Sequence, residues 1–262
     1  ACRWRWAAEE RFDMKIVFDE GVEDVYAAVS MGRVVRGHGP YGILIGDEKL
    51  HFSGAVIADP VPTGAQILAA AGLLQPGEHP LFRMLADGLL EEIRPEETTD
   101  LRSAGAERFL VFRNDRSFRF QLDDRAYDWG AARISGATLK RLAGRDVPTH
   151  DVWLDVPGAT DRLIGDAELV DLAAPGVERL ITLPISITIV VNARPRQVHR
   201  RRVAYWEIVK LAYPEAVPSE NIIYTVNYAR GPAPNPEGSM VEGQSVQIKE
   251  GMTFYVTPTD KS

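Results

Sequence analysis

A run of ten residues that begins at Ser135, SGATLKRLAG, carries the clearest hydrophobic pattern in the chain. Leu139 and Leu142 recur at the spacing that places apolar side chains on one side of a helix. Ser135 favours the start of a helix, because its side-chain oxygen accepts a bond from a free N–H group of the first turn. Gly144 suits the left-handed residue that follows a helix. The pattern predicts a helix of about two to three turns, which is too short to be stable unless it packs on a sheet.

Alternation on both sides of this helix predicts the strands of that sheet. The upstream hairpin places apolar residues at every second position: Phe118, Phe120, Leu122, Tyr127 and Trp129. Asp123 and Asp124 form the turn of the hairpin. Downstream, apolar residues around Val152, around Ile164 and at residues 180–183 predict three further strands. The predicted order is strand, strand, helix, strand, short strand, final strand.

The same order is predicted three times along the chain. The helix pattern of residues 135–144 has a counterpart in residues 63–72, TGAQILAAAG, and a fainter one that begins at Ala204, AYWEIVKLAY. A predicted hairpin precedes each helix, and strands follow it. Repeats of roughly 70 residues indicate a tandem array, so the chain is predicted to hold three small domains. Because each domain would have a thin core, we expect neighbouring repeats to pack against each other.

A short helix packed across a mixed sheet in this strand order resembles the β-grasp fold, which is the fold of ubiquitin. The resemblance is closest in three segments: the run FQLDDRAYDW from Phe120, the helix at residues 135–144, and the end of the chain from Gly251. In these segments the sequence is similar to the bacterial multiubiquitin-domain family of tandem ubiquitin-like proteins. The resemblance covers roughly residues 41–262. It implies an α+β protein with three tandem β-grasp (ubiquitin-like) domains and an N-terminal extension.

The repeat sets the expected domain boundaries. We expect an N-terminal extension at residues 1–40, β-grasp domains at residues 41–114, 115–184 and 185–256, and a C-terminal tail at residues 257–262. We expect residues 1–13 to be a vector remnant or an over-extended start, and residues 15–18 are strand-like. Residues 22–35 are apolar enough to pack as a helix or as strands. Such a segment, without a partner in its own domain, can add to a sheet edge of another copy.

The net charge of −7 and the pI of about 5.4 argue against a general nucleic-acid binder. One stretch is basic, and it comprises Arg194, Arg196, His199, Arg200, Arg201 and Arg202. A solvated strand face, or a docking surface for an acidic neighbour, explains this stretch more simply than contact with RNA does. We therefore expect no nucleic-acid partner.

Candidate chemistry is sparse. The single cysteine, Cys2, excludes an internal disulfide framework and fits a reducing cytoplasm, where we expect the protein. Residues 1–13 lack the apolar core of a signal peptide, and no apolar run approaches membrane-spanning length, so we expect no membrane partner. The five histidines show no metal-ligand spacing, and no nucleophile motif occurs. The GxGxxG match at residues 37–42 precedes a predicted strand, whereas a dinucleotide site requires a helix there. We expect no metal, no cofactor and no catalytic residue, and the resemblance implies a protein that is not itself an enzyme.

The resemblance draws attention to the C-terminal tail, because ubiquitin-like modifiers present such a tail to an activating enzyme. The tail comprises Thr257, Pro258, Thr259, Asp260, Lys261 and Ser262, which show no helical or strand pattern. It lacks the terminal diglycine that threads a narrow active-site channel. Trimming cannot expose a glycine, because the nearest one, Gly251, precedes the last strand. Three explanations stay open: partner enzymes that accept a different end, cleavage of the tail by a peptidase, or a scaffold that is not conjugated.

Two functions from different classes follow. The resemblance implies a bacterial ubiquitin-like modifier that is the substrate of an activating enzyme, a conjugating enzyme and a peptidase of the same operon, with a role in antiphage defence. Its expected docking face in the third repeat consists of Ile222, Tyr224 and Val226, although core packing explains half of these positions equally well. The alternative is a non-conjugated scaffold whose N-terminal domains and edge strands assemble into an oligomer or a filament. A module for sulfur transfer is disfavoured, because it also requires a terminal glycine.

Overall fold

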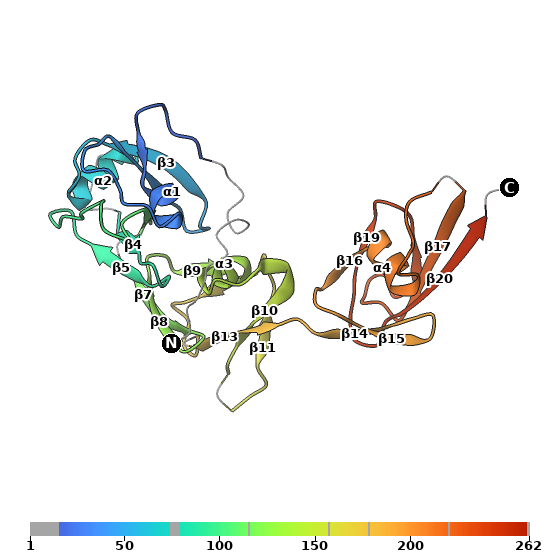
Figure 1. The fold of residues 1–262 in the computed structure, drawn as a ribbon. Helices are drawn as coiled ribbons and strands as arrows, with labels where there is room; N and C mark the ends of the chain where they lie inside the picture. Colours follow the sequence, from blue (N-terminus) through green and yellow to red (C-terminus); the bar gives the residue numbers. More distant parts are fainter. Residues whose placement is uncertain are drawn as a thin grey trace, which may run out of the picture. The chain divides into compact units, whose positions relative to one another are not determined.

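The computed structural model describes residues 16–73, 79–114, 116–156, 158–177, 179–219 and 221–260. These residues form two compact units, both drawn in Figure 1. The first unit lies within Ala1–Asp146 and Val152–Thr182 and holds the first repeat and most of the second. The second unit lies within Val147–Asp151 and Leu183–Ser262 and holds the third repeat.

Each repeat contains the elements that the hydrophobic pattern predicts. Repeat one consists of β2 (Tyr41–Gly46), β3 (Phe52–Ile57), α2 (Gly64–Ala70), β4 (Leu81–Met84), β5 (Leu90–Ile93) and β6 (Arg108–Val111). Repeat two consists of β7 (Phe118–Leu122), β8 (Arg125–Trp129), α3 (Gly136–Leu142), β10 (His150–Leu154), β11 (Arg162–Ile164) and β13 (Arg179–Pro184). Repeat three consists of β14 (Ile187–Val191), β15 (Arg194–Val198), α4 (Tyr205–Ala212), β17 (Ile222–Ala229), β18 (Gly238–Met240) and β20 (Thr253–Asp260).

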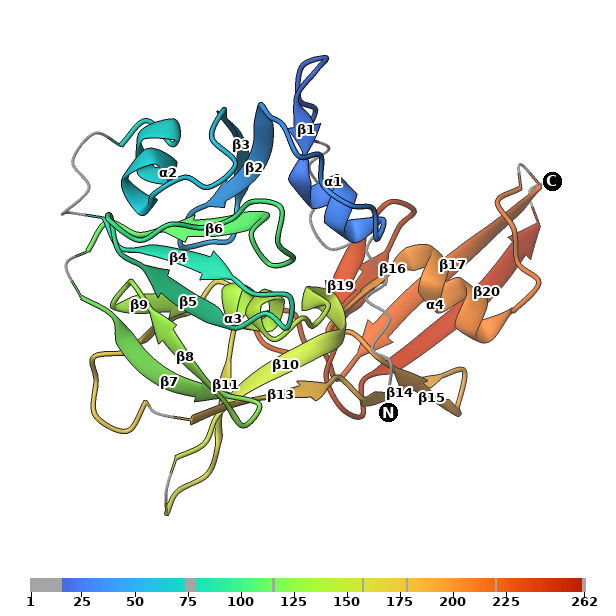
Figure 2. The same cartoon turned by 60° about the vertical axis from the view of Figure 1, so that its left-hand side comes forward.

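Short additional elements complete repeats two and three. In repeat two, β9 (Arg133–Ser135) pairs with β12 (Leu169–Asp171), and the 3-10 helix η2 (Val147–Thr149) precedes β10. In repeat three, β16 (Arg202–Ala204) pairs with β19 (Ser245–Gln247). Figure 2 shows α4 lying across β17 and β20, so that one face of this sheet is covered by the helix.

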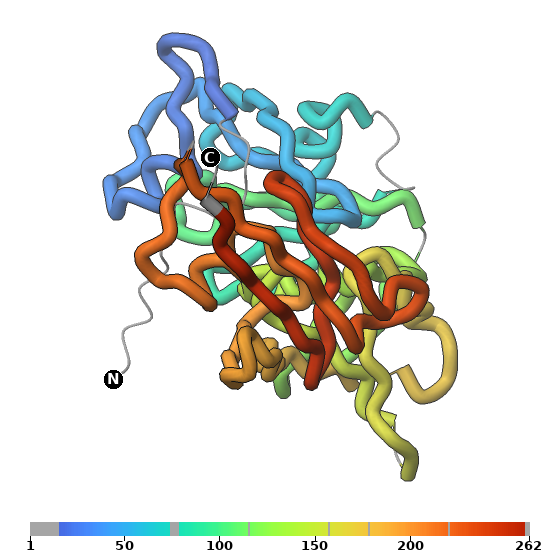
Figure 3. Tube along the Cα trace, turned by 90° about the vertical axis from the view of Figure 1, so that its right-hand side faces the viewer, coloured from blue at the N-terminus to red at the C-terminus, as the bar shows by residue number. Residues whose placement is uncertain are grey.

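The final strand of each repeat lies in the middle of its sheet. The strand orders are β3-β2-β6-β4-β5, β8-β7-β13-β10-β11 and β15-β14-β20-β17-β18. In all three sheets the final strand runs parallel to the first strand, and Figure 3 shows β17 and β20 side by side along their length. This order defines the β-grasp domain, and it confirms the predicted α+β fold of three tandem ubiquitin-like repeats.

The helices begin and end at the predicted residues. The Ser135 hydroxyl accepts a bond from the Thr138 N–H (3.1 Å), and the Thr63 hydroxyl accepts one from the Gln66 N–H (3.2 Å). Gly144 follows α3 with a φ of 68°, in the left-handed region that favours glycine. Thr63, Ser135 and Gly144 therefore have the helix-capping roles that the sequence pattern predicts.

A glycine at the first position holds α2 and α3 close to a neighbouring loop. A β-carbon at Gly64 would overlap the carbonyl oxygen of Arg94, and one at Gly136 would overlap the carbonyl oxygen of Gly165. Only glycine fits this approach without a shift of the backbone. Repeat three differs, because Tyr205 is the first residue of α4.

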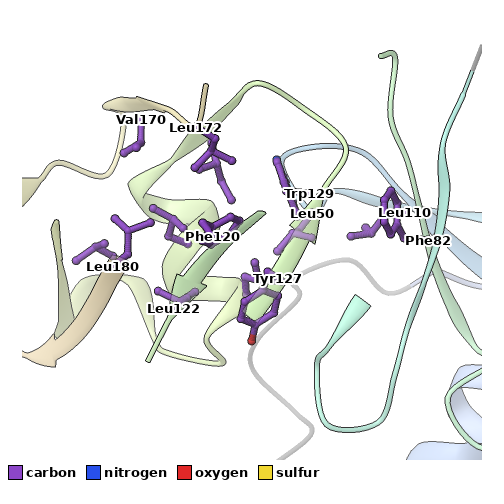
Figure 4. Packing of buried hydrophobic residues seen from close by; sticks show 14 of the residues in the cluster. Leu50, Phe82, Leu110, Phe120, Leu122, Tyr127, Trp129, Val170, Leu172 and Leu180 are labelled. Atoms are coloured by element: carbon purple, nitrogen blue, oxygen red, sulfur yellow. The ribbon is translucent and has the colours of Figure 1, made fainter. Parts of the chain in front are cut away.

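The two repeats of the first unit share one hydrophobic core. The Phe112 ring of repeat one meets the Trp129 ring of repeat two edge to face, with the ring centroids 4.8 Å apart. Leu50 lies beside Trp129 in the same cluster, as Figure 4 shows. The strand β2 is buried along its whole length, because α2 and its core cover one face while this shared core covers the other. The thin core expected of a single repeat is thus enlarged by packing between repeats.

The N-terminal extension belongs to the core of repeat one. The short strand β1 (Glu23–Asp24) pairs in parallel with the start of β2, and the helix α1 (Val25–Ser30) follows it. Val25 and Ala28 are fully buried. The prediction of a segment without a partner in its own domain is therefore wrong, since β2 supplies that partner. Residues 16–18 form no strand, while residues 1–15 lie outside the described part of the chain.

Glu23 anchors this extension. Its carboxylate accepts bonds from Arg33 Nη1 (2.6 Å) and Arg36 Nε (2.5 Å), and its side chain is only 5 % exposed. Burial alone raises the pKa of Glu23, but the bonds from the two guanidinium groups outweigh that effect and hold the pKa below its ordinary value.

We predict that Glu23→Gln lowers the free energy of unfolding of the first unit by about 1–2 kcal/mol at neutral pH. A carboxyl group with a depressed pKa stabilises the fold above its unfolded-state pKa, and it loses that contribution as the pH falls through its folded-state pKa. The difference between the wild type and the variant should therefore shrink in acid. Urea denaturation from pH 7 to pH 3 measures it, and a difference independent of pH would contradict this account of Glu23.

The shared core predicts that Gly130→Ala destabilises the first unit by about 1–3 kcal/mol. A β-carbon at Gly130 would lie 2.5 Å from the ring of Phe112, which has no room to move between the two repeats. Gly37→Ala is the matched control, because a β-carbon there has nothing within 4 Å. Denaturation of both variants tests the packing between repeats, and equal stabilities would exclude it.

Candidate functional site

The C-terminal tail is part of the sheet in repeat three. Residues 257–260 lie in β20 and pair with residues 222–225 of β17. The prediction that the final strand ends near Val256 and leaves a tail without strand structure is therefore wrong for these four residues. Thr257 and Thr259 are β-branched, which favours a strand, and β17 extends far enough to pair with them. Lys261 and Ser262 lie outside the described residues.

The register of this pairing explains how a proline is accommodated. The Val256 N–H donates to Asn192 Oδ1 (2.8 Å), and Asn192 Nδ2 donates to the Val256 carbonyl (2.9 Å), so both backbone groups of Val256 face away from β17. Backbone groups alternate between the two sides of a strand. Those of Thr257 and Thr259 therefore face β17, and those of Pro258 face outward, where the missing N–H removes no bond to β17.

The three residues predicted as a docking face have different surroundings. Val226 is fully buried in the core of repeat three, so the fold excludes it from direct contact with a partner. Ile222 is 36 % exposed and Tyr224 is half-buried, and both line a groove beside β17. The core-packing explanation therefore applies to Val226, while Ile222 and Tyr224 lie at a surface that a partner can reach.

The groove has a volume of about 660 Å³ and is lined largely by aromatic and aliphatic side chains. Its floor contains Tyr205 and Trp206 at the start of α4, with the Trp206 ring centroid 6.0 Å from that of Tyr224. The Tyr205 hydroxyl donates to the carbonyl oxygen of Tyr224, and burial raises the pKa of Tyr205, so this donor keeps its proton at neutral pH. Trp206 Nε1 donates to Glu242 Oε1 (2.7 Å), which fixes a carboxylate at the rim.

The sequence analysis missed Tyr205, Trp206 and Glu242. A signal for the first two was present, because the helices of repeats one and two begin with Gly-Ala, whereas that of repeat three begins with Tyr-Trp. Two large aromatic residues replace two small ones at the point where the helix approaches the loop. No comparable signal indicated Glu242, which is brought to the groove by the turn after β18.

The basic stretch of repeat three is largely engaged within its own unit. Its hydrogen bonds join Arg200 to Glu207, Arg201 to Asp151 and Arg202 to Ser245. Asp151 belongs to the second unit together with η2. Two of these partners, Glu207 and Asp151, are acidic, so the chain itself supplies acidic neighbours to part of the basic stretch.

Other candidate chemistry does not gather into a site. Gly37 and His38 form a bend, and Tyr41 and Gly42 already lie in β2, so no helix N-terminus follows the GxGxxG match. Within the described ranges, no group of three or more His, Cys, Asp and Glu side chains is arranged to hold a metal ion. The helices in that part of the chain are all too short or too polar to span a membrane.

The three β-grasp repeats in tandem, with the last strand continuing into the tail, define a ubiquitin-like tandem-repeat protein. The model of the family described as Multiubiquitin matches residues 52–114, 118–185 and 187–260, one match for each repeat. The chain belongs to the Multiubiquitin family. No curated protein matches it.

We predict that Asn192→Asp loosens the tail strand. The carboxylate would replace the amide donor with an oxygen that faces the Val256 carbonyl, and the loss should destabilise the second unit by about 1–3 kcal/mol at pH 7. Protonation restores a donor, so the effect should diminish in acid. Hydrogen exchange across β20 measures the loosening.

Asn227→Asp is the matched control, because Asn227 is an exposed residue on the neighbouring strand β17. It should leave exchange in β20 unchanged. Faster exchange in both variants would show that added charge, and not the lost bond to Val256, loosens the strand.

Proposed function

We propose that this protein is a ubiquitin-like modifier that activating and conjugating enzymes join to other molecules through its C-terminal tail, and that a peptidase processes. In this proposal the chain is a substrate of enzymes and has no catalytic role of its own. The proposal includes a location in the bacterial cytoplasm, partner enzymes that are encoded in the same operon, and a role in antiphage defence. It is supported by membership of the Multiubiquitin family and by the direct continuation of the last strand into the tail.

The position of the tail supports this function most directly. Among the residues that the structure describes, β20 pairs beyond Val256 only with β17, because its pairing with β14 involves Thr253 and Phe254 alone. No other described strand pairs with the outward edge of residues 257–260. An enzyme can approach this edge without disturbing the core of repeat three.

An enzyme that binds residues 257–260 in an extended channel must first separate them from β17. The backbone bonds involved are those of Thr257 and Thr259, each worth about 1 kcal/mol net. Such a cost is small beside the binding energy of a protein partner. The tail is thus held in place in the free protein and released at low cost.

A second candidate function, a self-assembling scaffold, is favoured by apolar side chains exposed in the first repeat. Met31 is 79 % exposed and Val34 is 86 % exposed, and both belong to the N-terminal extension. Val56, 51 % exposed, lies on the edge strand β3, whose pairing partner among the described strands is β2. Exposed apolar residues beside an unpaired edge favour association between copies. The two functions are compatible, since a modifier can also assemble.

The test is denaturing mass spectrometry of the protein after co-expression with the genes that flank its own. We expect species of higher mass that survive denaturation. A variant that stops after Asp260 removes Lys261 and Ser262 but keeps every pair between β17 and β20, and it should form no such species. Lys261→Arg is the matched control, because it keeps the length of the tail, and its adducts should persist.

Two outcomes would overturn the proposal or redirect it. If the wild type shows only its unaltered mass, while light scattering shows a mass that rises with concentration, the protein is a scaffold and the modifier function is excluded. If the chain that stops after Asp260 still forms adducts, the reactive carboxylate lies upstream of Lys261, and the tail is trimmed before use.

A further inference from the structure

The groove of repeat three exists because this repeat departs from the other two at the start of its helix. In repeats one and two, the close approach of a loop carbonyl leaves room only for Gly64 and Gly136. Tyr205 and Trp206 replace the Gly-Ala pair in repeat three, and their rings pack edge to face with the centroids 5.5 Å apart. In repeats one and two, a glycine allows the start of the helix to approach the loop closely. In repeat three, the start of the helix forms an aromatic surface.

The same groove contains an unpaired strand edge. Both backbone groups of Val226 face β18, where Val226 pairs with Met240 at the end of that strand. By alternation, the groups of Tyr224 face the same side, beyond the end of β18. The Tyr224 carbonyl accepts from Tyr205, whereas the part of the chain that the structure describes supplies no acceptor for the Tyr224 N–H. A short length of β17 is therefore open to a further strand.

The chemistry of the groove selects a basic side chain. Glu242 is exposed at the rim, and the bond from Trp206 occupies one of its carboxylate oxygens and leaves the other available. The faces of aromatic rings attract cations, and Trp206 and Tyr224 lie within the same groove. An acidic side chain would be repelled by Glu242, while a lysine or arginine would meet both the rings and the carboxylate.

We propose that the groove of repeat three binds an extended peptide segment of a partner protein, which adds to the free edge of β17 and places a lysine or arginine side chain over Trp206, beside Glu242. The segment pairs through backbone bonds that include the Tyr224 N–H. The next side chain of the segment faces the opposite side of the sheet, beside Ile223, which is 47 % exposed, so an aliphatic residue fits best there. Residues 257–260 lie along the other edge of β17, which brings the partner next to the tail.

The test uses the full chain and a fluorescent synthetic peptide of sequence Arg-Val-Thr and measures fluorescence anisotropy. The arginine pairs opposite Tyr224, and the other two residues run antiparallel to β17 along Ile223 and Ile222, clear of the pairing between Val226 and Met240. Trp206→Ala should weaken binding about tenfold, as expected for the loss of a cation–π contact and its packing. Glu242→Gln should weaken it about threefold, because this carboxylate is exposed to solvent. Hydrogen exchange of the Tyr224 amide should slow when the peptide binds.

Matched controls separate this site from non-specific association. Tyr255→Ala removes an exposed aromatic residue from the same repeat and should leave the affinity unchanged. A peptide with glutamate in place of arginine should bind at least tenfold more weakly. Glu242→Gln keeps the test informative if Trp206→Ala fails to fold.

Equal binding by the wild type, Trp206→Ala and Glu242→Gln would overturn the proposal, as would unchanged exchange at Tyr224. The assay contains no activating or conjugating enzyme. Its result therefore stands apart from the modifier function, and either proposal can fail while the other holds.

Discussion

The central position of the final strand is the constraint on which every repeat depends. In repeat three, β14 and β15 form one half of the sheet, β17 and β18 form the other, and β20 alone joins them. The sheet is incomplete until the last residues of the repeat are in place, and its stabilising contacts are long-range in sequence. The tail is a continuation of this strand. The segment that a modifier would present to its enzymes is therefore held by the same pairing that holds the domain together, and it leaves the domain from the middle of the sheet.

The repeats bury enough apolar surface in two different ways. Repeats one and two share a core around Phe112 and Trp129, so that β2 is buried on both faces and the N-terminal extension adds Val25 to the opposite side. Repeat three completes a core of its own, to which β20 contributes Phe254 and Val256. Because burial per residue rises with the size of the folded unit, we expect the first unit to unfold as one cooperative body, with the third repeat as a separate one.

Repetition also reveals where the structure of one copy departs from that of the other two. The first position of the helix is under the same backbone constraint in repeats one and two, and glycine satisfies it in both. In repeat three that constraint is relaxed, and Tyr205 and Trp206 form the floor of a groove. The groove and the tail then lie along opposite edges of β17. A partner bound at one edge is within two strand spacings, about 10 Å, of the residues at the other.

The sequence by itself determined the type and order of the elements, the three repeats and the fold class. These features follow from local physical chemistry: alternation of apolar residues in strands, helical spacing, a capping hydroxyl at Ser135 and a left-handed Gly144. Only the tertiary structure decided that residues 257–260 continue the final strand, that Val226 is buried while Tyr224 lines a groove, and that two repeats share one core. Each of these depends on which distant segments meet. Residues 257–260 form a strand because β17 is long enough to pair with them. The sequence pattern of the tail does not indicate that this pairing partner exists.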